Sequence, residues 1–177
     1  MSDDASSRGF SLIELLVVVA VIAIIAGVAI PALLHARISA NETAAIASLS
    51  AIRSAQSTYA STCARGGFAQ SLNDLALSPA GATQGFISEP LGANGVIRSG
   101  YVANLMPDLG AAMVTAAAQT CNGSTADAMS GYFAERHPNQ IGFTGNRAFA
   151  IATSTTIYVR DDGTLIAPGM AGASALR

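Results

Sequence analysis

The apolar and polar positions divide the chain into three stretches. Residues 15–34 form the uninterrupted apolar run LLVVVAVIAIIAGVAIPALL, which holds 20 residues and no charge. A helix needs about 20 such residues to cross a hydrocarbon core about 30 Å thick. We therefore expect a membrane-spanning helix, and a buried core helix of a soluble protein is the alternative.

An amphipathic stretch follows the apolar run. Ile38, Ala45, Ile52 and Tyr59 recur every seven residues, with Leu49 between the last two, whereas Arg37, Glu42, Arg53 and Gln56 are expected mainly outside this stripe. One apolar stripe predicts a helix that packs on another element. A dimeric coiled coil is less favoured because the stripe is rich in Ala. No Gly or Pro interrupts residues 32–62, so a continuous helix from Phe10 to about Thr62 would measure about 80 Å.

The region after Cys63 is Gly-rich and carries strand signals. The expected strands are 96–98, 101–103, 131–134, 148–152 and a hairpin of 156–160 with 164–167, turning at Asp161-Asp162-Gly163. Asp-Gly between alternating apolar residues is a strong hairpin signal. Residues 71–75 predict one short helical turn, and 109–120 is compatible with helix or loop. The expected fold class is α+β: a long N-terminal helix packed on a small antiparallel sheet.

Composition excludes several functional classes. Charged residues make up 11% of the chain, hydrophobic residues 51%, and the net charge is −2. Intrinsic disorder and an electrostatic surface for nucleic acid are therefore excluded. All nine cationic residues are Arg, so a Gly-Lys-Ser/Thr phosphate loop and Lys Schiff-base chemistry are excluded as well. We expect no catalytic residues, no cofactor and no metal site.

The residues before the apolar run do not resemble an ordinary cleaved secretory signal. The apolar run is longer than the usual core of about 7–15 residues, and no clear small-x-small cleavage site follows it. Glu14 lies at its start, where a carboxylate is costly to bury in lipid and calls for a cationic partner. The alternative is that Glu14 only favours the start of the helix through the helix dipole.

The stretch RGFSLIELLVVV, residues 8–19, resembles the start of type IV pilins and type II secretion pseudopilins. The resemblance is strongest over residues 8–60. It implies that a prepilin peptidase cuts between Gly9 and Phe10 and methylates the new Phe10 amine. It further implies that Glu14 pairs with the Phe10 amine of a neighbouring subunit during assembly.

The resemblance also concerns the apolar helix. Pro31 lies where the family commonly has a helix-bending proline, and Gly27 four residues earlier adds softness. We expect a kink at Gly27 and Pro31. Ala23 and Gly27 have a spacing that allows close helix packing in lipid, although an Ala-rich spanning helix explains them equally well.

Cys63 and Cys121 are the two thiols of the chain. In an exported head a disulfide is the expected state, with two buried free thiols as the alternative. Asp161 and Asp162 are a weak calcium candidate, because a plain turn is favoured without further fixed oxygen ligands. His35 and His137 are expected to be solvated.

These inferences define four segments: a cleaved leader (1–9), an assembly helix (10–34), its amphipathic continuation (35–62) and a globular head (63–177). The resemblance implies a filament subunit that is held in the bacterial inner membrane before it joins a periplasmic or surface homopolymer. Its partners would be other copies, the peptidase and an inner-membrane assembly platform. The pilin is the first interpretation; a pseudopilin or a membrane-anchored periplasmic binding module is the alternative.

Overall fold

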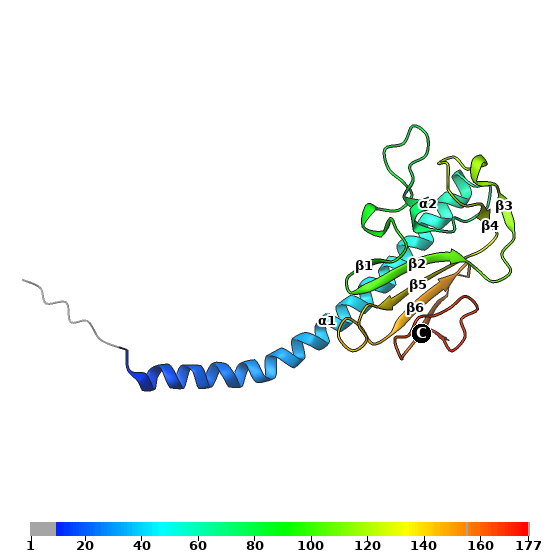
Figure 1. The fold of residues 1–177 in the computed structure, drawn as a ribbon. Coiled ribbons are helices and arrows are strands. Elements are labelled where there is room, and N and C mark those ends of the chain that lie inside the picture. Colours follow the sequence, from blue (N-terminus) through cyan, green and yellow to red (C-terminus); the bar gives the residue numbers. More distant parts are fainter. Residues whose placement is uncertain (1–9, 155, 177) are drawn as a thin grey trace, which may run out of the picture. The chain divides into compact units, whose positions relative to one another are not determined.

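The computed structural model describes residues 10–154 and 156–176 (Figure 1). The expected leader, including Gly9, lies outside the described residues. The described chain forms two compact units that divide between Ala36 and Arg37.

One long helix, α1 (Leu12–Thr62), belongs to both units. It begins two residues later than expected, with Ser11 ahead of its first turn, and it ends at Thr62 as expected. Pro31 lies inside the helix, and the chain is helical on both sides of it. The expected kink at Gly27 and Pro31 stays a prediction.

The second unit contains a six-stranded antiparallel sheet in the order β1-β2-β5-β6-β7-β8. Its strands are β1 (Val96–Arg98), β2 (Tyr101–Pro107), β5 (Tyr132–Pro138), β6 (Ala148–Ala152), β7 (Ile157–Arg160) and β8 (Ser174–Ala175). The two longest strands, β2 and β5, pair so that Tyr101 lies opposite Pro138 at one end and Pro107 lies opposite Tyr132 at the other. A long helix followed by an antiparallel sheet confirms the α+β class.

The two faces of the sheet have different covers. The second half of α1 packs on one face through Ala45, Leu49, Ile52 and Tyr59, all fully buried. The other face carries Phe133, Ala148 and Ala150, which pack with Ile166 from the segment after β7. The period-2 alternation of β5 and β6 thus supplies both cores, because successive side chains of a strand point to opposite faces.

The smaller elements follow local sequence signals in part. Helix α2 (Leu72–Ala76) confirms the expected helical turn, and Ser71 caps it by accepting a hydrogen bond from the Asp74 N–H. The 3-10 turn η1 (Glu89–Leu91) precedes the sheet. The ambiguous segment 109–120 forms strand β3 (Met113–Thr115), which pairs with β4 (Ala128–Met129), and the 3-10 turn η2 (Ala117–Gln119).

The expected hairpin of 156–160 with 164–167 is wrong. The turn after Arg160 forms, but residues 164–167 are not a strand, and β7 pairs with β6 and β8. Arg160 binds the carbonyl oxygens of Leu165 and Ala171, which holds this segment in a loop. Ile166 is fully buried against the sheet, so packing on the sheet face took precedence over local alternation.

Two polar residues expected mainly outside the apolar stripe of α1 lie within its buried face. The exposed fraction is 6% for Glu42 and zero for Gln56. Gln56 donates to the Ala69 carbonyl (2.7 Å) and accepts from the Ala69 N–H (2.9 Å). Both polar ends of its amide are therefore satisfied, which makes the burial tolerable.

Candidate functional site

The start of α1 is closed by a hydrogen bond between Ser11 and Glu14. The Ser11 N–H donates to Oε2 of Glu14 at 3.1 Å, and the Ser11 carbonyl accepts from the N–H groups of Glu14 and Leu15. Ser-x-x-Glu with this contact is one half of a capping box. The helix-start role of Glu14 is thus realised in the single chain, while its Oε1 has no hydrogen-bond partner among residues 10–154 and 156–176.

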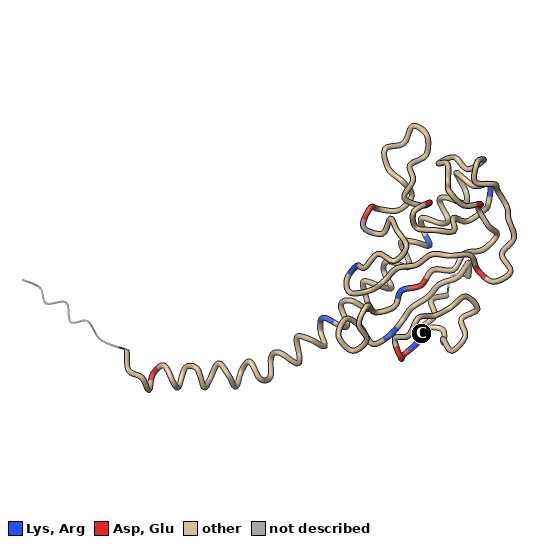
Figure 2. The backbone as a smooth tube through the Cα atoms, in the orientation of Figure 1, with Lys and Arg blue, Asp and Glu red and all other residues tan. Residues whose placement is uncertain are grey.

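The apolar surface that follows Glu14 is open. The large hydrophobic side chains from Phe10 to Leu34 are between 50% and 81% exposed. Of the described helices, α1 is the one long and apolar enough to cross a membrane, and none of its most apolar window is buried. Figure 2 shows one acidic position near the start of this helix, and the described residues from Phe10 to Ala36 hold no other acidic residue and no Arg. Such a surface needs lipid or other apolar surfaces to cover it.

Gly27 and Pro31, both expected to soften the helix, lie on this open part of α1. A Cβ at Gly27 would meet no heavy atom within 4 Å in the described chain. No contact among the described residues therefore requires glycine at this position.

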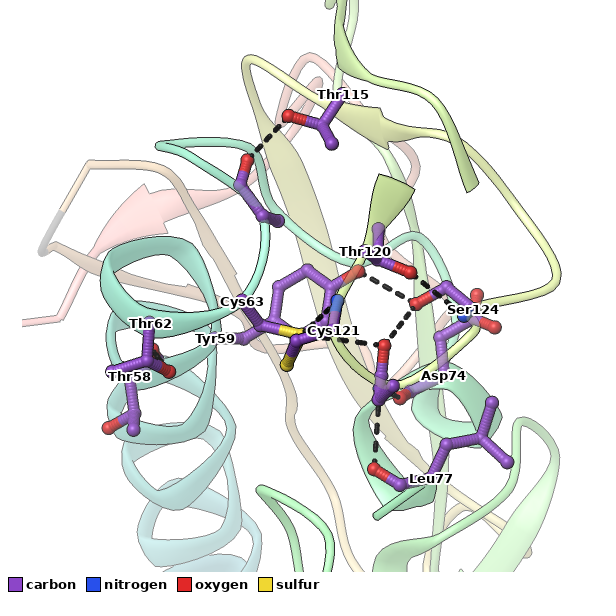
Figure 3. Close-up of a disulfide and its surroundings, with 12 residues drawn as sticks. Thr58, Tyr59, Thr62, Cys63, Asp74, Leu77, Thr115, Thr120, Cys121 and Ser124 are labelled. Carbon is purple, nitrogen blue, oxygen red and sulfur yellow. Dashed lines mark hydrogen bonds between the residues drawn. A yellow bond between two sulfur atoms is a disulfide. The ribbon is translucent and has the colours of Figure 1, made fainter. Parts of the chain in front are cut away.

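The carboxyl-terminal end of α1 is tied to the head by the Cys63–Cys121 disulfide (Figure 3). Beside it, the Tyr59 hydroxyl lies 2.7 Å from Oγ of Ser124, and burial raises the pKa of Tyr59. The pair joined is the one that the sequence analysis expected. Because Cys63 directly follows the last turn of α1, the disulfide fixes the end of the helix to the segment around Cys121.

A polar network around fully buried Asp74 supports this region. Oδ1 of Asp74 accepts from the N–H (2.7 Å) and the hydroxyl (2.8 Å) of Thr125. The side chain of Asn122 donates to the Asp74 carbonyl at 2.7 Å. The segment after Cys121 is therefore held against α2 as well as against α1.

At the other end of the head, a carboxylate of α1 is held by the loop between β5 and β6. Oε2 of Glu42 accepts from Nε (2.8 Å) and Nη2 (2.6 Å) of Arg147, and Oε1 accepts from the Asn146 N–H at 3.1 Å. The hydrogen bond to Glu42 raises the pKa of Arg147. Sequence reasoning missed this pair, since the two residues are 105 positions apart.

Strand β5 carries three consecutive ionisable residues. Glu135 is fully buried, and its carboxylate accepts from Asn104 Nδ2 (2.6 Å) and lies 3.0 Å from Nδ1 of His137. Burial raises the pKa of Glu135, against the opposing effect of these hydrogen bonds. The side chain of His137, expected to be solvated, is 23% exposed and lies against this buried acid.

Arg136 points away from Glu135, as strand alternation requires, and is also fully buried. Its Nη2 donates to the Arg98 carbonyl at 2.8 Å, while Nε and Nη1 have no hydrogen-bond partner among the described residues. Burial lowers the pKa of Arg136 to about 10.

The calcium candidate gains no support from its surroundings. Oδ1 of Asp162 accepts from the N–H (2.9 Å) and the hydroxyl (2.7 Å) of Thr164, and these bonds lower the pKa of Asp162. Within the described residues there is no group of three or more His, Cys, Asp or Glu that could hold a metal ion. The two aspartates stand in a turn closed by Thr164.

A groove of about 820 Å³ lies in the head along the last turns of α1. Arg53 and Arg65 lie at its walls, with Phe68 and Tyr132 among the lining residues. Burial raises the pKa of Tyr132 to about 12, and nearby Arg53 opposes this. The groove thus combines arginine side chains with aromatic surface. Its lining residues include no His, Asp or Glu that could serve as a general base.

Comparison with known proteins bears on the first thirty residues and a little beyond. The family model described as the prokaryotic N-terminal methylation motif matches residues 4–30, which include Gly9, Phe10 and Glu14. The type IV wide pilus major component PilA4 of Thermus thermophilus is 57% identical over 44 residues. That alignment covers 25% of this chain and 34% of the relative, about a third of the relative's length.

No solved structure matches this chain. The chain carries the prokaryotic N-terminal methylation motif, and its long apolar helix followed by an antiparallel sheet matches the α+β arrangement expected of a pilin.

Proposed function

We propose that the protein is a pilin, the structural subunit of a type IV pilus-like filament. A peptidase cuts between Gly9 and Phe10, the Phe10 amine is methylated, and copies assemble through residues 10–34. The observation that carries the proposal is the methylation motif joined directly to an open apolar helix surface. A pseudopilin of a type II secretion system would carry the same features and is the second candidate.

The physical reason for assembly is the cost of leaving the membrane. The 20-residue apolar run of the precursor is covered by lipid in the inner membrane. Lifting it out of the bilayer is tolerable only if other apolar helices replace the lipid, because exposed apolar surface is unfavourable in water. Copies of the same helix supply that surface, and an inner-membrane assembly platform supplies the work.

Glu14 is proposed to set the register between neighbours. In the single chain, Oε2 accepts from Ser11 and Oε1 is left without a partner among the described residues. Cleavage creates an ammonium group at Phe10. A neighbour's amine at Oε1 would satisfy a carboxylate that is costly to leave unpaired in a low dielectric.

Two substitutions separate the capping role of Glu14 from the charge-pairing role. Gln can also close a capping box, so Glu14→Gln keeps the bond to Ser11 and removes the negative charge. Glu14→Ala removes both. The proposal expects both variants to insert into the membrane and neither to give wild-type filament yield in sheared surface fractions.

Normal filament yield from Glu14→Gln would mean that capping alone is needed, and register by charge pairing would be rejected. Fibres seen by electron microscopy and lost on deletion of the protein support the pilin. A secretion defect without surface fibres would assign the pseudopilin instead. Retention in the membrane with neither fibres nor a secretion defect would favour an anchored binding module.

A further inference from the structure

The loop 139–147, between β5 and β6, presents two apolar side chains to solvent. Ile141 is 52% exposed and Phe143 is 79% exposed. They stand in a fold unit whose other large aromatic side chains are mostly buried in its core. Two neighbouring exposed apolar side chains in one loop form a candidate contact surface.

The loop is held in one conformation by its own bonds. The Gly142 N–H donates to the Gly145 carbonyl and the Thr144 N–H to the Gln140 carbonyl, both at 2.9 Å. A Cβ at Gly145 would overlap the Tyr101 hydroxyl. Ile141 and Phe143, which form the tip of this loop, are therefore exposed although the loop itself is held in place by hydrogen bonds and packing.

The loop lies at the end of the head where α1 enters it (Figure 1). Its Thr144 carbonyl accepts from Nδ2 of Asn41 at 2.9 Å, and Arg147 holds Glu42. Asn41 follows Leu34, the last residue of the apolar run, by only seven positions. Even a fully extended chain of that length spans no more than about 25 Å, and a helical one about 10 Å.

These facts point to a lipid surface as the partner of the tip. We propose that Ile141 and Phe143 rest in the headgroup layer of the membrane while the subunit awaits assembly. The proposal rests on the proposed function, which places residues 15–34 across that membrane. Apolar side chains such as Phe are the ones that interfacial segments bury at the boundary between headgroups and acyl chains.

A second copy of the chain fits the tip less well. A stable protein–protein contact buries about 800 Å² on each partner, far more than two side chains provide. Charges near the tip have both signs, because Arg147 ends the loop and interacts electrostatically with Asp161, in the turn that reaches Ile141 at Gly163. The contact should therefore depend on apolar insertion and not on anionic headgroups.

The test uses tryptophan fluorescence, because the natural chain contains no Trp. Full-length Phe143→Trp is reconstituted at a low protein-to-lipid ratio in phosphatidylcholine vesicles, with and without brominated chains. The expected result is emission shifted to shorter wavelength and partial quenching by the brominated lipid, unchanged when phosphatidylglycerol is added. Leu109→Trp is the matched control, since Leu109 is 71% exposed beyond the opposite end of β2.

Val19→Trp reports separately on the span. If it is quenched while Phe143→Trp emits as in water, the tip proposal is overturned and the spanning helix stands. If Val19→Trp is not quenched, the span itself fails, and with it the membrane part of the proposed function. A shift of Phe143→Trp that appears only at high protein density would assign the tip to another subunit and overturn the lipid contact.

Discussion

Arg147 binds Glu42 through two hydrogen bonds, of 2.8 and 2.6 Å, to the same carboxylate oxygen. The carboxylate comes from α1, and the guanidinium comes from the last residue of the loop between β5 and β6, 105 positions later in the sequence. The side chain of Glu42 is 8% exposed and that of Arg147 is 41% exposed. The pair therefore joins the helix to the loop before β6 at the edge of the core. The Glu42 carboxylate is nearly inaccessible to water, so its hydrogen bonds must come from the protein.

Removal of this carboxylate should destabilise the head. Glu42→Ala leaves the Asn146 N–H and the Arg147 guanidinium without their acceptor, which we expect to cost about 1–3 kcal/mol of unfolding free energy. Urea denaturation in detergent micelles measures the change. Glu89→Ala, at an exposed position, is the control and should stay within about 0.5 kcal/mol of wild type.

The coupling between the two residues is open to a double-mutant cycle. Combined Glu42→Ala and Arg147→Ala should cost less than the sum of the single changes. Strict additivity would mean that the two side chains contribute independently, contrary to the contact described.

The disulfide should contribute strongly to stability. It closes a loop with a sequence separation of 58 residues. Chain entropy for a loop of that size corresponds to about 4 kcal/mol. Addition of a reductant should lower the melting temperature of the wild type. The Cys63→Ala/Cys121→Ala variant is the control, since a reductant should leave its lower melting temperature unchanged.

The burial of Glu135 leads us to expect a pH-dependent difference in unfolding free energy between the wild type and Glu135→Gln. Because burial raises the folded-state pKa above its ordinary value of 4.5, the folded protein holds this proton more tightly than the unfolded chain. The contribution of Glu135 to stability must then fall as pH rises from about 4.5 through the folded-state pKa. Gln has no such proton.

The unfolding free energy of Glu135→Gln minus that of the wild type should therefore increase with pH over this window. Urea denaturation at a series of pH values measures it, and Glu89→Gln controls for removal of an exposed carboxylate. A difference that stays constant with pH would show that the buried acid does not behave as described.

We expect an apolar substitution at Gln56 to lower the free energy of unfolding strongly. Gln56→Leu is of similar size but leaves both the N–H and the carbonyl of Ala69 without their partner. Each unpaired buried group costs about 1–3 kcal/mol. Gln56→Leu should lower the denaturation midpoint more than Glu42→Ala does, which the same urea experiment tests. Equal or greater stability of Gln56→Leu would show that the two bonds contribute little.

The extent of the long helix, the helical turn at α2 and most strands of the sheet were predictable from the residues alone. Each of these elements is predicted by a pattern of neighbouring residues. An apolar run with an apolar stripe predicts the long helix, residues 71–75 predict the helical turn, and alternation over about five residues predicts the strands. The candidate site at Phe10 and Glu14 was found in the same way, since the motif is contiguous in the chain.

Only the tertiary structure decided which polar side chains are buried, among them Glu42, Gln56, Glu135 and Arg136. A polar side chain can be buried where the fold brings a hydrogen-bond partner to it, and the sequence does not show partners 105 positions away. The same applies to residues 164–167, whose alternating pattern favours a strand while the open face of the sheet draws Ile166 into the core. Local periodicity thus determined the elements, and the burial of apolar surface together with long-range hydrogen bonds determined how they close into a head.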